Sequence, residues 1–122
     1  RGVDDEVLIP HSRYTSVSKK DIDSTPNIDL LLYSDEAGVC LVASRDGKQV
    51  FISGHLEYDK DTLKKEYFRD LDKGLPIDIP KNYFKNNNTS TEPIVKWRSS
   101  AHLLFSNWLN YCVYQETPFE LK

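Results

Sequence analysis

The feature of this sequence that most constrains its fold is the broad apolar face of residues 97–115. Apolar side chains recur there at the three- and four-residue spacing of an α-helix. They are Trp97, Ala101, Leu104, Phe105, Trp108 and Cys112, with Leu109 and Tyr111 widening the stripe. A stripe of this width has to be buried against another layer of secondary structure. Any fold proposed for this chain therefore needs a surface large enough to cover that helix.

Three short apolar runs predict the strands of such a layer: residues 28–33, 38–44 and 49–53. The turn at residues 45–48 contains an Asp-Gly pair, which is typical of tight hairpins, so the second and third runs should pair as antiparallel strands. Three short strands are too few to cover the helix. We therefore expect an α/β fold whose sheet is larger. The chain begins at Arg1 and contains 0 Met, so we also expect it to be a piece of a longer polypeptide.

A second helix is predicted from residue 58 or 59 to Lys73, because apolar side chains recur there every four residues. These side chains are Leu63, Tyr67 and Leu71. Asp59 or Asp61 can cap its start, and Gly74 fits the position just past its end. Residues 74–95 then form a connector rich in Pro and Asn, and a loop of that length tends to be functional or disordered.

Composition excludes several classes of function. A chain of 122 residues fits one domain. Its net charge of −3, with basic residues scattered among acidic ones, argues against a nucleic-acid partner. The longest apolar runs are too short to span a membrane. The two cysteines have no closely spaced partner, which predicts neither a metal site nor a disulfide framework and favours a cytoplasmic protein.

His55 and Glu57 are the strongest candidates for chemistry. In an extended segment, residues two apart project to the same side. Glu57 could then accept a hydrogen bond from one ring nitrogen of His55 and fix its tautomer, leaving the other nitrogen to take a proton. The pair follows a strand that meets a helix, where α/β proteins build their sites. A surface histidine beside a glutamate is common, however, so a purely structural interpretation stays open.

Two further groups have both a functional and a structural interpretation. Glu66 and Arg69 are three residues apart on the predicted helix, as an exposed ion pair would be. Equally, an arginine held by a carboxylate could bind an anionic substrate. The loop PHSRYT, residues 10–15, suits a binding loop or a solvated connector.

No convincing nucleophile accompanies the base. Cys40 lies within a predicted strand and Cys112 within a predicted helix, and both look like small buried hydrophobic residues. Ser53 and Thr62 are near the pair and are candidates only by elimination.

Several segments, in the same order along the chain, resemble the homoserine O-acyltransferases. That family has a flavodoxin-like, class I glutamine-amidotransferase-like fold. The matching segments are PHSRYT (10–15), GVCLVASRDGKQVFISGHLEYD (38–59), EYFRD (66–70), KGLP (73–76), PKNYFKNNN (80–88) and WRSSAHLLFSNWLNYCVYQETPFEL (97–121). The resemblance implies that residues 1–122 are the C-terminal part of one acyltransferase domain, within an α/β three-layer sandwich.

The resemblance also implies an activity. Family members transfer an acyl group from acetyl-CoA or succinyl-CoA to the hydroxyl of L-homoserine in methionine biosynthesis, through a cysteine acyl-thioester. The matching motifs make His55 the catalytic base and Glu57 its orienting carboxylate. They make Arg69 a homoserine-binding residue, Glu66 its helper and Ser12 a residue of the substrate pocket. No metal and no cofactor is implied beyond acyl-CoA as co-substrate.

The chain departs from the family in one major respect. The family's nucleophilic cysteine and a substrate-binding lysine lie in the half that precedes this chain, and neither Cys40 nor Cys112 matches the nucleophile. We therefore expect the N-terminal part of the same enzyme as a partner, with a homodimer as one expected assembly. Acetyl-CoA is the expected donor because that activity is the commoner one. Leu56 stands where many relatives carry Pro.

Two alternatives remain open from the sequence. A glutaminase domain of a class I amidotransferase would share the His-x-Glu arrangement and the fold, although the segments at 66–70 and 97–115 argue against it. A fragment that binds substrate but catalyses nothing would follow from the lack of a nucleophile.

Overall fold

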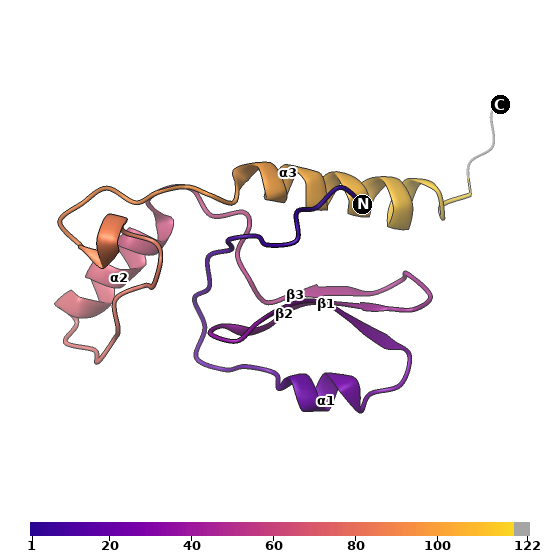
Figure 1. The fold of residues 1–122 in the computed structure, drawn as a ribbon, viewed down its shortest axis with the longest axis horizontal. Helices are drawn as coiled ribbons and strands as arrows, with labels where there is room; N and C mark the ends of the chain where they lie inside the picture. Colours follow the sequence, from indigo (N-terminus) through magenta and orange to yellow (C-terminus); the bar gives the residue numbers. More distant parts are fainter. Residues whose placement is uncertain (119–122) are drawn as a thin grey trace.

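The computed structural model describes residues 1–118, so residues 119–121 of the last matching segment lie outside the described range. Along the chain come α1 (Lys19–Asp23), β1 (Ile28–Ser34), β2 (Gly38–Ser44), β3 (Val50–Ile52), α2 (Thr62–Asp72), η1 (Lys85–Asn87), α3 (Arg98–Asn107) and η2 (Trp108–Tyr114). The last of these continues α3 as a π-helical segment. The arrangement is mixed α/β (Figure 1). The finer expectation of a flavodoxin-like sandwich stays a prediction.

The three strands form one antiparallel sheet in the order β1-β2-β3. The predicted hairpin is confirmed: β2 and β3 pair with Val42 opposite Phe51, and Gly47 adopts a φ of +72° in the turn between them. β3 is shorter than the predicted strand, but the backbone N–H of Ser53 still donates to the carbonyl of Cys40 at 2.8 Å. The sheet therefore delivers the chain directly to residues 54–57.

α2 begins later than predicted. Asp61 is its N-cap without a side-chain hydrogen bond, whereas the hydroxyl of Thr62 accepts a hydrogen bond from the backbone N–H of Asp59 at 3.2 Å. The turn before the helix is thus closed by a threonine and not by an aspartate. Gly74, with a φ of +72°, follows the helix end as predicted. The predicted stripe is only partly buried, because Leu71 is 41% exposed.

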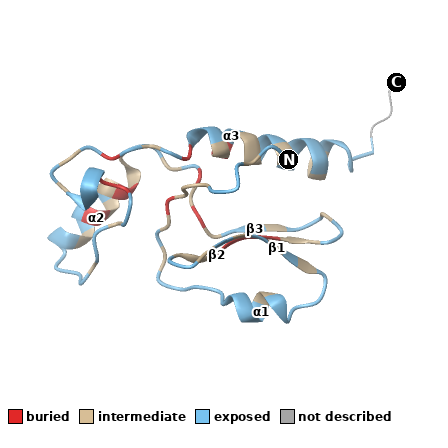
Figure 2. Ribbon diagram, in the orientation of Figure 1, coloured by how far each residue is buried: buried red, intermediate tan, exposed pale blue. Residues whose placement is uncertain are grey.

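Buried apolar side chains from several segments form a cluster that we call the junction core. It consists of Leu56, Leu63, Tyr67, Tyr83, Phe84, Trp97 and Ala101. It joins the start of α3 and the buried side of α2 to the segment that leaves β3 (Figure 2). The long connector contributes Tyr83 and Phe84 to it, so that part of the connector is packed and not solvated. Aromatic side chains of this size dominate the stability of a small core.

The apolar face of α3 and η2 is packed only at its beginning. Trp97 and Ala101 are buried, whereas Phe105 is 40% and Trp108 43% exposed. Phe105 and Trp108 line a groove of about 440 Å³ between the helix and β3. As predicted from the width of the face, three strands do not cover it. Within residues 1–118 no helix has the length and apolar character needed to cross a membrane.

Candidate functional site

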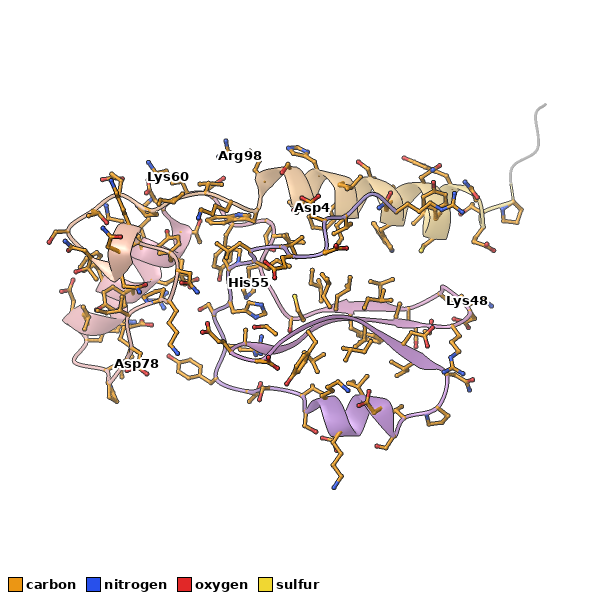
Figure 3. All side chains as sticks on the ribbon, in the orientation of Figure 1. Asp4, Lys48, His55, Lys60, Asp78 and Arg98 are labelled. Carbon is orange, nitrogen blue, oxygen red and sulfur yellow. The ribbon has the colours of Figure 1, made fainter. Side chains whose placement is uncertain are left out.

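The candidate site lies where the chain leaves the sheet on its way to the junction core, at the position of His55 in Figure 3. The backbone N–H of His55 donates to the carbonyl of Pro10 at 2.7 Å, which joins the segment after β3 to the PHSRYT loop. Gly54 makes this close approach possible. A Cβ at that position would overlap Cγ2 of Ile9 and lie 3.2 Å from both Sγ of Cys40 and Nε2 of His11.

His55 and Glu57 make the contact that their spacing predicts. Nδ1 of His55 lies 2.8 Å from Oε1 of Glu57. An ionised carboxylate only accepts, so the neutral ring carries its proton on Nδ1 and presents an unprotonated Nε2. Burial works against ionisation of Glu57, but the hydrogen bond from His55, a backbone hydrogen bond and the charge of His55 together lower the pKa of Glu57 below its usual value. The pair is therefore set up for proton transfer at Nε2.

Nε2 of His55 has one neighbour from the PHSRYT loop, the backbone carbonyl of Ser12 at 3.4 Å. A carbonyl cannot donate, so this contact becomes a hydrogen bond only once Nε2 has taken a proton. The carbonyl of Ser12 is placed to accept a hydrogen bond from a protonated Nε2. Ser12 thus contacts the ring of His55 through its backbone carbonyl.

The PHSRYT loop is fixed to the sheet by Arg13. Its guanidinium donates to Oγ of Ser53 at 3.3 Å and to the carbonyl of Ala37, and it contacts Nδ1 of His11. Burial, together with the charges of Arg13 and His55, lowers the pKa of His11. His11, itself a loop residue, is half-buried next to Gly54. Arg13 thus attaches the loop to the sheet, while Ser12, Tyr14 and Thr15 remain exposed.

Tyr58 is a site residue that sequence reasoning missed. Its ring stacks on the imidazole of His55 with centroids 4.4 Å apart and planes 10° from parallel. Its hydroxyl donates to Oε1 of Glu66 at 2.8 Å. Its carbonyl accepts a hydrogen bond from the indole of Trp97 at 2.9 Å. In the sequence, the only sign of this contact is that Tyr58 follows His55 by three residues. That spacing brings the two rings together because the chain turns after β3, where the backbone N–H of Tyr58 donates to the carbonyl of His55.

Glu66 and Arg69 do not contact each other as the sequence suggested. Nε of Arg69 lies 2.8 Å from Oδ1 of Asp70. Adjacent residues on a helix seldom face each other, which is why Asp70 was not predicted. Oε2 of Glu66 is buried and has no hydrogen-bond partner. Glu66 therefore uses one oxygen for Tyr58 and leaves the other oxygen free.

An open pocket of about 400 Å³ connects these groups. Its lining includes Ser12 from the loop and Glu66, Arg69 and Asp70 from α2. His55 lies next to it, because Ser12 both lines the pocket and contacts Nε2. The fold thus gathers the five predicted site residues around one loop, with a positive and a negative group on the same helix.

The two hydroxyl candidates for a nucleophile are occupied. The hydroxyl of Ser53 donates to the carbonyl of Val39 at 2.6 Å, and that of Thr62 accepts from the backbone of Asp59. Cys40 is 5% exposed, and burial raises the pKa of its thiol. Cys112 lies in η2. Residues 1–118 contain no group of three or more His, Cys, Asp or Glu side chains arranged to hold a metal ion.

Fold and site together define a mixed α/β protein with a histidine–carboxylate pair beside a polar pocket. The family profile described as Homoserine O-succinyltransferase matches residues 1–119. The chain belongs to that family.

Curated relatives agree with this assignment. A protein named Homoserine O-acetyltransferase 1 from Ilyobacter polytropus is 67% identical over 122 residues, which is 100% of this chain and 40% of the relative. Proteins named Homoserine O-acetyltransferase from Geobacillus sp. (strain WCH70) and Clostridium acetobutylicum are 60% and 59% identical over 98% and 99% of this chain. Each match again covers 40% of the relative. The chain therefore spans about 40% of the length of these proteins.

Proposed function

We propose that these residues form the general base and the amino-acid-binding part of a homoserine O-acyltransferase. The enzyme would move an acyl group from acyl-CoA to the hydroxyl of L-homoserine, in methionine biosynthesis. The observation that carries the proposal is the His55–Glu57 pair, 2.8 Å apart, beside a pocket that holds an arginine and a carboxylate. The family assignment and the names of the relatives support the same reaction.

His55 is the base of the transfer step. Its Nε2 removes the proton from the homoserine hydroxyl while that oxygen attacks the acyl-thioester carbon, and the thiolate leaves. Glu57 holds the ring in the tautomer that this step needs and stabilises the imidazolium. The carbonyl of Ser12, 3.4 Å from Nε2, accepts a hydrogen bond from Nε2 once that nitrogen is protonated. The proton then returns from Nε2 to the leaving thiolate.

The pocket beside His55 binds the amino-acid end of the substrate. Arg69 matches an α-carboxylate, since a guanidinium presents a planar fork of donors. The unpartnered Oε2 of Glu66 matches an α-ammonium group. Holding both charged groups orients the hydroxyl toward Nε2. Ser12, on the pocket wall, is placed to restrict the size of the side chain that reaches the base.

The cysteine that carries the acyl group lies outside these residues in this proposal. The burial of Cys40 and the raised pKa of its thiol support that interpretation. The relatives' greater length supports it as well. A flavodoxin-like sheet completed by the remaining residues would place the cysteine and an oxyanion hole opposite Nε2.

We propose acetyl-CoA as the donor, because the similar curated proteins are named acetyltransferases. The family profile bears a succinyltransferase name, so the test has to compare both donors. The test uses the longest natural polypeptide that contains these residues, called the full polypeptide below. O-acetyl- and O-succinyl-homoserine are measured by mass spectrometry after incubation with L-homoserine and each acyl-CoA. Product from acetyl-CoA is expected. Glutamine hydrolysis without acyl transfer would replace this proposal with a glutaminase.

The role of His55 is tested in the same assay. His55→Ala should lower turnover by about 10²- to 10⁴-fold, the usual contribution of a positioned general base. His102→Ala is the matched control, because His102 is exposed in α3 and should leave turnover unchanged. A loss smaller than about tenfold in His55→Ala would remove the role assigned to it.

A further inference from the structure

We propose that Tyr58 is a positioning residue with two separate tasks: its ring fixes the plane of the His55 imidazole, and its hydroxyl fixes the Glu66 carboxylate. One side chain would then set the spacing between the base and the group that receives the substrate's ammonium. The inference rests on the proposed function and adds a residue that neither the family assignment nor the motif comparison supplied.

The ring of Tyr58 restricts how His55 can turn. The two rings are stacked at 4.4 Å between centroids and 10° between planes. Glu57 holds one edge of the imidazole through Nδ1, and the stacked ring covers one of its faces. A hydrogen bond alone permits rocking about its own axis, whereas a flat contact on the ring face opposes it. The direction of Nε2 is thereby fixed.

The backbone of Tyr58 is itself held in place. The indole N–H of Trp97, which is 2% exposed, donates to the Tyr58 carbonyl at 2.9 Å. The backbone N–H of Tyr58 donates to the carbonyl of His55 at 3.3 Å. The stack therefore rests on the junction core and does not depend on a mobile side chain.

The hydroxyl of Tyr58 acts on a different residue. It donates to Oε1 of Glu66 at 2.8 Å, which leaves Oε2 buried and unpartnered. Burial and the neighbouring Glu66 charge raise the pKa of Tyr58, so the hydroxyl keeps its proton at neutral pH and remains a donor. Without this bond the Glu66 carboxylate is no longer held in its present orientation next to the pocket that Glu66 helps to line. The hydroxyl should matter for binding homoserine and not for the proton transfer.

Two variants separate the tasks, measured in the full polypeptide. Tyr58→Phe keeps the ring and removes the hydroxyl, so KM for homoserine should rise about tenfold, as loss of one hydrogen bond to a charged group predicts, with kcat changed less than about threefold. Tyr58→Leu removes the ring as well, so kcat should also fall by about 10- to 100-fold from misdirection of the base. Tyr33→Phe, at an exposed position on β1, is the control and should change neither.

A purely structural role gives a different result. If Tyr58 only supported the fold, both variants would lower the melting temperature and the amount of active enzyme without a division between KM and kcat. That outcome overturns the proposal, as does a Tyr58→Leu enzyme with kcat within threefold of the parent.

A second readout does not require activity. With ¹³C-labelled histidine, the ring protons of His55 should show an upfield ring-current shift that Tyr58→Phe keeps and Tyr58→Leu loses. Retention of the shift in Tyr58→Leu overturns the stacking part of the proposal. If the parent makes no O-acyl-homoserine but the shift behaves as expected, the proposed function fails while the positioning of His55 by Tyr58 stands.

Discussion

The junction core and the groove between α3 and β3 contain the same kinds of side chain, but the junction core buries them and the groove leaves them partly exposed. Trp97, in the junction core, is 2% exposed, whereas Trp108, further along the same helix at the start of η2, is 43% exposed. Both belong to the apolar face that the sequence predicted as one continuous stripe. The chain therefore completes its packing where the site is and leaves it open where the sheet faces the helix.

This difference explains why the site geometry is well defined. His55 lies between the sheet and the junction core, and its backbone, both ring nitrogens and one ring face have identified contacts. None of those contacts involves the groove. The positions of His55 and the pocket should therefore depend on the junction core, and hardly at all on what lies against Phe105 and Trp108.

The largest effect should come from removing the centre of the junction core. Trp97→Ala should destabilise the 122-residue chain by about 3–5 kcal/mol, the usual result of truncating a buried aromatic side chain. The loss includes the indole hydrogen bond to the Tyr58 carbonyl. Chemical denaturation measures the free energy of unfolding. A change below about 1 kcal/mol would contradict the view that this cluster stabilises the molecule.

A smaller effect is expected at the point where the site is most tightly packed. Gly54→Ala places a methyl group against Ile9, Cys40 and His11, and overpacking of this kind destabilises by about 1–3 kcal/mol. The strain should push the PHSRYT loop away from His55. We expect both a lower free energy of unfolding and altered NMR signals of the His55 ring.

Gly47→Ala is the matched control for this variant. A Cβ at Gly47 meets nothing within 4 Å, but its φ of +72° makes alanine unfavourable there by about 1 kcal/mol. The control should lose stability in the hairpin turn and leave the His55 signals in place. Equal disturbance of His55 by both variants would show that the close approach at Gly54 has no special importance.

Local patterns predicted the elements of this molecule well. The Asp-Gly turn fixed the β2–β3 hairpin, and the two-residue spacing of His55 and Glu57 correctly indicated their contact. These features depend on backbone geometry within a few residues, which a sequence displays directly. The predicted start of α2 was wrong. Asp59, Asp61 and Thr62 can each cap the helix, and the free energies of these alternatives differ little.

The contacts between distant segments were beyond the reach of such patterns. Nothing in the sequence brings the carbonyl of Ser12 to Nε2 of His55, across 43 positions, except the final packing of the loop. The pairing of Glu66 with Tyr58 in place of Arg69 has the same cause, since the junction core holds Tyr58 within hydrogen-bonding distance of Glu66 on α2. The pattern indicated Glu66 and Arg69, and only the tertiary structure showed that their partners are Tyr58 and Asp70.

Substituting Trp108, the exposed tryptophan, tests whether the two regions differ in their contribution to stability. Trp108→Ala should change the free energy of unfolding of the 122-residue chain by about 1 kcal/mol or less, since a half-exposed side chain has little burial to lose. In the full polypeptide the same substitution should be worth several times more if further residues cover the groove. Equal losses from Trp97→Ala and Trp108→Ala in the 122-residue chain would abolish the distinction between the two regions.

The smallest effect that we expect is the contribution of His11 to the pH dependence of the free energy of unfolding. Burial, Arg13 and His55 lower the pKa of His11, so the unfolded chain binds a proton more readily than the folded one. Stability from this source is full above the ordinary histidine pKa near 6.5 and is lost as the pH falls from there through the lower folded-state value. Denaturation midpoints from pH 7.5 to pH 5 should decline less in His11→Gln than in the parent, because the variant has no proton to gain there. A parallel decline in both proteins would mean that His11 takes up its proton as easily in the folded loop as in the unfolded chain. The PHSRYT loop around His11 would then be packed more loosely than the junction core.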